Sequence, residues 1–73
     1  LKAYRLIRAE QYDQAGMVLE KIVDENPDDL EAGLNMAIVE IRQEKKDIAR
    51  ERLTRLSERY PDHPVIRRLL DQL

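Results

Sequence analysis

Apolar residues recur along the chain at the three- and four-residue spacing of amphipathic helices. The clearest example is a stripe made of Leu30, Leu34, Ala37, Ile38 and Ile41. Similar stripes predict four more helices, at about residues 1–7, 12–23, 47–60 and 64–73. Leu, Ala, Glu, Arg and Lys are plentiful, and these residues favour helices. The pattern therefore predicts an all-α chain of five helices.

Proline residues and short polar stretches separate these helices. Pro27 and Pro61 end the second and fourth, because proline cannot continue a helix and pushes the residue before it into an extended conformation. Asp28 is expected to cap the third helix in a capping box with Glu31. His63, which precedes the fifth helix, is expected to cap it.

The chain repeats itself after 34 positions. Nine aligned pairs are identical: Ala3/Ala37, Ile7/Ile41, Arg8/Arg42, Glu10/Glu44, Asp13/Asp47, Ala15/Ala49, Leu19/Leu53, Pro27/Pro61 and Asp28/Asp62. We interpret residues 1–73 as one domain that contains two copies of a helical hairpin and a final helix. The first repeat spans about residues 1–28, the second about 29–62, and the C-terminal helix about 63–73.

The composition of the chain argues against several classes of function. The 73 residues include no cysteine, so neither a disulfide framework nor a thiolate zinc site can form. His63 is the only histidine and Ser57 the only serine, and no catalytic constellation surrounds them. We therefore predict no enzymatic activity, no catalytic residues, no cofactor and no metal site. No apolar run approaches the roughly 20 residues of a transmembrane helix, which predicts no membrane insertion.

The charges are unevenly distributed. Residues 1–41 carry four basic and nine acidic side chains, and residues 42–73 carry nine basic and six acidic, which gives −5 and +3. One interpretation is a solvated surface of mixed sign, and the other is an electrostatic dipole that orients a partner. Acidic residues interrupt the basic half and aromatic residues do not accompany it, so nucleic acid is not the predicted partner.

The 34-residue helical hairpin resembles the tetratricopeptide repeat. Small residues of that motif match Ala3 and Ala37 before the turn, and Ala15 and Ala49 after it, where helices cross closely. Tyr12 matches its aromatic position, Leu19 and Leu53 an apolar position, and Pro27 and Pro61 the terminal proline. The chain departs from the motif at Gly33, Glu40 and Lys46, where the family prefers aromatic residues. Glu10 and Glu44 stand in turns where it commonly has glycine.

The resemblance implies a right-handed α-α superhelix, a solenoid whose first helices line a concave face that holds a partner peptide or helix. It places these partner-binding residues there: Tyr4, Ile7 and Arg8 from the first repeat, Leu34, Ile38, Ile41 and Arg42 from the second, and Val65 and Arg68 from the final helix. Glu31 and Gln72 share the face. The apolar members either form part of the core or form a groove edged by arginine, which would suit a partner helix with acidic flanks.

Two roles remain open at this stage. The first is a protein–protein interaction module within a larger scaffold or assembly protein, of which a chain starting at Leu1 is expected to be a fragment. The second is a structural module that docks on neighbouring repeats or forms a homodimer through its first or last helix. A carboxylate clamp for chaperone tails is disfavoured, because only Asn35 matches the clamp positions and Tyr4, Val65 and Leu69 occupy the others.

Overall fold

The computed structural model describes residues 2–73 and, within them, contains five α-helices. They are α1 (Lys2–Arg8), α2 (Tyr12–Glu25), α3 (Leu30–Arg42), α4 (Lys46–Arg59) and α5 (Pro64–Asp71). The prediction of an all-α chain of helical hairpins is confirmed. Leu1, which was assigned to the first helix, lies outside the described residues. None of the helices within residues 2–73 has the length and apolar character needed to cross a membrane.

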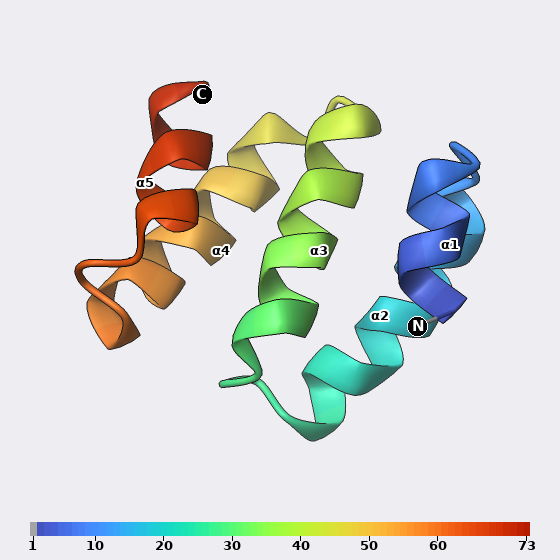
Figure 1. The fold of residues 1–73 in the computed structure, drawn as a ribbon, viewed down its shortest axis with the longest axis horizontal. Helices are drawn as coiled ribbons and strands as arrows, with labels where there is room; N and C mark the ends of the chain where they lie inside the picture. The colour runs from blue at the N-terminus through green and yellow to red at the C-terminus, as the bar shows by residue number, and fades with distance from the viewer. Residues whose placement is uncertain (1) are drawn as a thin grey trace.

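Successive helices pack against one another in order, and α1 also contacts α3. Figure 1 shows α1, α3 and α5 nearest the viewer, with α2 and α4 behind them. The three front helices run in the same direction, from the lower part of the view to the upper part. The C-terminal ends of α1, α3 and α5 consequently lie on one side of the molecule, and this arrangement defines the face considered below.

Two clusters of buried side chains form the core. The first lies between α1, α2 and α3 and consists of Ala3, Ala15, Leu19, Ala32 and Val39. The second lies between α3 and α4, with α5 packed on it, and consists of Ala37, Ala49 and Leu53. Five of these residues are alanine, which allows close approach of the helices, and the 34-residue register predicts four of them: Ala3, Ala15, Ala37 and Ala49.

The caps of α3 and α5 differ in how well the sequence predicts them. His63 caps α5, because its Nδ1 accepts the Val65 amide at 3.3 Å. The capping box assigned to Asp28 is wrong. Asp29 is the N-cap of α3, and its Oδ1 accepts the Ala32 amide at 2.9 Å. Asp28 instead faces the end of α4, where its backbone oxygen accepts the Tyr60 hydroxyl at 2.9 Å.

Both repeats turn between their helices through the same backbone geometry. Glu10 and Glu44 have φ angles of 60° and 63°, in the left-handed region that favours glycine. After α1, the amide of Glu10 donates to Ile7 and that of Gln11 to Leu6. After α3, Glu44 and Lys45 make the equivalent bonds to Ile41 and Glu40. Each turn is therefore a Schellman motif with glutamate in place of the usual glycine.

Glycine at either turn is expected to stabilise the chain. Glu10→Gly and Glu44→Gly should each raise the free energy of unfolding by about 0.5–1 kcal/mol, because they relieve the steric cost of a left-handed non-glycine residue. Urea denaturation followed by circular dichroism measures the change. The matched control is Glu20→Gly within α2, where φ is negative and glycine should lower stability by about 0.5–1 kcal/mol. A loss in the turn variants equal to that of the control would contradict the expected relief.

Candidate partner-binding face

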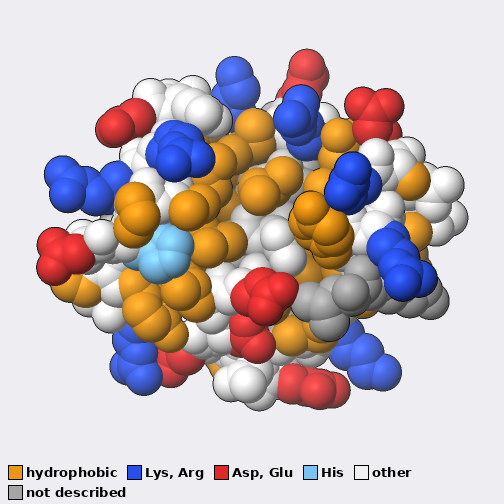
Figure 2. Space-filling view, viewed as in Figure 1, with side chains coloured by type: hydrophobic (Ala, Val, Ile, Leu, Met, Phe, Trp, Pro, Cys, Tyr) orange, Lys and Arg blue, Asp and Glu red, His pale blue; other side chains and the backbone are white. Residues whose placement is uncertain are grey.

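The structure places all nine predicted partner-binding residues on α1, α3 and α5. Tyr4 is 51% exposed, and the three arginines of the set are exposed as well. The aliphatic members of the set are half-buried. On the side viewed in Figure 2, hydrophobic side chains gather over α3 and α5, and basic side chains lie around them. The side chains are thus accessible to a partner, although most are not freely exposed.

One part of this face is a groove between α3 and α5, which we call the α3–α5 groove. Its lining consists of Ile38, Ile41, Arg42, Leu69 and Gln72. Leu34 and Ile41 also pack against the second core cluster. Ile41 therefore belongs both to the core and to the groove, the two alternatives that the sequence left open. Ile38 is half-buried, and the two core clusters do not include it. It is the apolar side chain of α3 that is best placed to contact a partner.

The other predicted residues of α1 and α5 do not line this groove. On α1, the guanidinium of Arg8 lies over the Tyr4 ring, 5.8 Å from its centroid, and Ile7 packs against the first core cluster. On α5, Arg68 lines an adjoining depression with Asp62 and Asp71 rather than the α3–α5 groove. The structure therefore brings Ile38, Ile41 and Arg42 together and leaves Arg68 beside them.

Sequence reasoning missed a second hollow, which we call the α1–α3 depression. Its apolar lining comes from Ala3, Val18, Leu19, Ile22 and Ala32, and its polar lining from Asp29, Glu31 and Asn35. The sequence pattern placed the α2 side chains among them only on the apolar stripe of the helix predicted at about residues 12–23. Ile22 lies three residues beyond the core position Leu19 and therefore on the same face of α2, which is a sequence signal for its place in the lining but not for its 39% exposure.

Ser57 and His63, the single serine and histidine of the chain, both make local hydrogen bonds. Ser57 Oγ donates to the Thr54 carbonyl at 2.6 Å, and His63 is occupied in its cap. Among residues 2–73, no group of three His, Asp or Glu side chains is placed to hold a metal ion. What the face offers is apolar surface with separately placed charges.

Comparison with known families agrees with the geometry. The sequence model described as tetratricopeptide repeat matches residues 6–73. No curated protein and no solved structure matches the chain. Proteins of this family generally act as protein–protein interaction modules and are typically not enzymes. The match covers nearly the whole sequence, and the chain therefore belongs to the tetratricopeptide repeat family.

Proposed function

We propose that the chain is an interaction module that holds an amphipathic partner helix or peptide across α1, α3 and α5, as part of a larger scaffold or assembly protein. The observation that carries this proposal is the α3–α5 groove, in which half-buried Ile38 and Ile41 lie beside Leu69. A partner that inserts an apolar side chain there would remove these three side chains from water.

Arginine residues define the chemistry of the preferred partner. Arg42 lines the groove, and Arg8 lies at the equivalent position of α1, at the same end of the face. Within residues 2–73, neither arginine forms an ion pair, so both guanidinium groups are available to carboxylates. The Tyr4 ring beneath Arg8 adds a flat apolar surface at the α1 side. A segment with apolar anchors and acidic flanks fits this arrangement.

Charge reversal at the two arginines tests the proposal. The probe is a fluorescent synthetic helix with leucine anchors and glutamate flanks. Arg8→Glu/Arg42→Glu should weaken its binding about tenfold and reduce the salt dependence, because attraction becomes repulsion. Fluorescence anisotropy at several salt concentrations measures both effects.

The matched control reverses two exposed arginines of α4, Arg55→Glu/Arg59→Glu, which changes the net charge equally. Thermal melting of each variant establishes that the fold is retained. Equal affinity of the groove variant and the wild type would contradict the groove assignment, whereas equal weakening in both variants would indicate only non-specific attraction.

Self-association is the second candidate function. It is favoured by exposed large apolar side chains on the first hairpin, where Tyr4 is half-exposed and Met17 is 73% exposed. The last helix supports it less, because Ile66 is fully buried and Leu69, Leu70 and Leu73 pack against the second core cluster. Sedimentation equilibrium distinguishes the two roles: a homodimer requires a concentration-dependent mass, and Met17→Lys should abolish it.

A further inference from the structure

The α1–α3 depression is a second apolar pocket on the proposed partner-binding face. Leu19, Ala3 and Ala32 are buried at its base, and Ile22 is partly exposed at its wall. Its volume is about 360 Å³, which lies in the range of small ligand pockets. Most of its surface is apolar, so it suits a bulky aliphatic or aromatic side chain rather than a charged group.

The charged groups beside this pocket are acidic. Glu31 is exposed at the rim, and the carboxylate of Asp29 caps α3 beside it. Arg42 lies at the opposite end of α3, in the α3–α5 groove, and Arg8 ends α1 on the same side. Figure 2 shows acidic side chains near the lower centre of the face and several basic ones above them. The face is therefore negative beside one apolar pocket and positive beside the other.

We infer that the partner segment is itself dipolar, with basic residues toward one end and acidic residues toward the other. This inference rests on the proposed function and specifies the chemistry of the partner. One apolar anchor with neighbouring Lys or Arg occupies the α1–α3 depression, and a second anchor with neighbouring Asp or Glu occupies the α3–α5 groove. Glu31 of one hollow and Ile38 of the other are seven positions apart on α3, which corresponds to about 10 Å along the helix axis. A partner helix would match this spacing with anchors at positions i and i+7.

The same charges also complement the helix dipoles, since Glu31 lies in the first turn of α3 and Arg42 in its last. If these charges acted only on the helix dipole, replacing them would change the stability of the fold. Binding would then not depend on the order of charges in the ligand. The test must therefore measure binding and its direction.

Two synthetic peptides of identical composition provide the probe. Each has about 18 residues, long enough to form a helix, and leucine anchors seven positions apart. In the block peptide, lysines surround the first anchor and glutamates the second. In the alternating peptide the same lysines and glutamates alternate along the polar face. We expect the block peptide to bind about three- to tenfold more tightly, because several ion pairs of modest strength form together.

A nitroxide label reports the direction of binding. A label at the lysine end of the block peptide should broaden the backbone amide signals of Glu31, Ala32 and Asn35. A label at the glutamate end should instead broaden those of Ile41 and Arg42. Glu31→Lys should remove the preference for the block peptide, whereas Glu58→Lys, the same charge change on α4, should retain it. Thermal melting of both variants controls for loss of the fold.

The outcomes separate this inference from the function on which it rests. Equal affinity for the two peptides, or equal broadening by labels at either end, would overturn the dipolar partner while leaving a groove that binds apolar helices. A preference that persists in Glu31→Lys would overturn it as well. No perturbation of α1, α3 or α5 signals by either peptide at millimolar concentration would overturn the proposed groove itself.

Discussion

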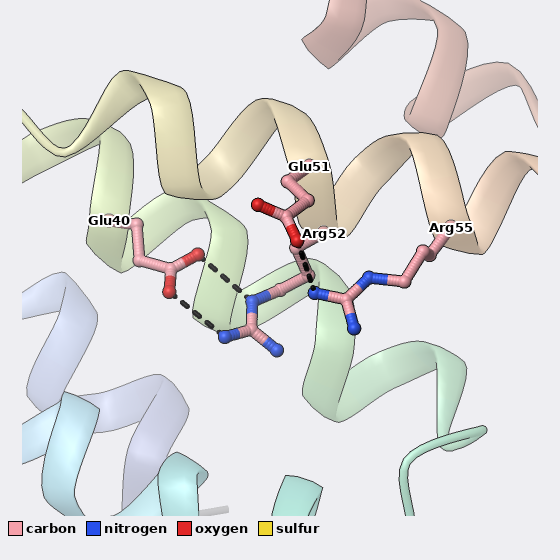
Figure 3. A network of polar contacts seen from close by, with 4 residues as sticks. All are labelled: Glu40, Glu51, Arg52 and Arg55. Atoms are coloured by element: carbon pink, nitrogen blue, oxygen red, sulfur yellow. Dashed lines mark hydrogen bonds and ion pairs between the residues drawn. The ribbon is translucent and has the colours of Figure 1, made fainter.

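Replacing Arg52 with alanine is expected to lower the free energy of unfolding by about 3 kcal/mol, because it leaves a buried carboxylate without its partner. Arg52 Nε donates to Glu40 Oε1 at 2.9 Å and its Nη2 to Oε2 at 3.0 Å, as Figure 3 shows. The Glu40 side chain is only 4% exposed and that of Arg52 22%. The pair links α3 to α4, and Arg52 supplies both of the hydrogen bonds described for the Glu40 carboxylate.

Two further variants isolate the cause. Glu40→Met/Arg52→Met removes both charges, and its stability should lie within about 1 kcal/mol of the wild type, since well-packed apolar residues replace a buried ion pair at little cost. Arg55→Ala breaks the neighbouring surface pair with Glu51, also drawn in Figure 3, and should cost no more than about 0.5 kcal/mol. Urea denaturation measures all three, and a loss in Arg52→Ala no greater than in Arg55→Ala would contradict the expected effect.

The buried pair could not be predicted from the sequence, for a reason that lies in the position of α3. A stripe of apolar residues predicts one buried side of a helix, and Glu40 lies outside that stripe. Helix α3 is central, however, and packs against α1, α2 and α4. Its buried residues, among them Ala32, Ala37 and Glu40, therefore extend around much of the helix. Sequence alone also gives no means of pairing Glu40 with Arg52 rather than with another arginine.

The helices themselves could be predicted closely because their signals are local. The prolines at 27 and 61 and the 34-residue repeat fix the order of the elements, and each predicted helix lies within a few residues of the observed one. Asp28 and Asp29 are adjacent and chemically equivalent as caps, so pattern alone could not choose between them. The conformation of the chain before Leu30 decides in favour of Asp29.

The candidate site likewise has one part that the sequence predicts and another that it does not. Ile38, Ile41 and Arg42 lie within two turns of one helix, and helical spacing was sufficient to group them. Leu69 joins them from α5, which requires knowledge of how α5 packs on α3 and α4. The α1–α3 depression depends on three helices at once, so no periodicity within a single segment indicates it.

Leu53→Ala is expected to lower the free energy of unfolding by about 2–5 kcal/mol, because it removes a fully buried side chain and leaves a cavity. Leu53 lies in the second core cluster with Ala37 and Ala49, against which α5 packs through Leu69 and Leu70. The cavity would therefore loosen both the second hairpin and the final helix. Ile48→Ala, on the same helix but half-exposed, is the matched control and should cost less than about 1 kcal/mol.

A reciprocal substitution tests whether Ala49 and Leu53 share one packed volume. Ala49→Leu alone should overpack the cluster at a cost of about 1–3 kcal/mol. The double variant Ala49→Leu/Leu53→Ala restores the total side-chain volume one turn away, so its loss should be smaller than the sum of the two single losses. Denaturant titration of the four proteins gives the coupling. Strict additivity would show that the two residues fill independent spaces, and no loss in Ala49→Leu would contradict the close approach of α3 and α4.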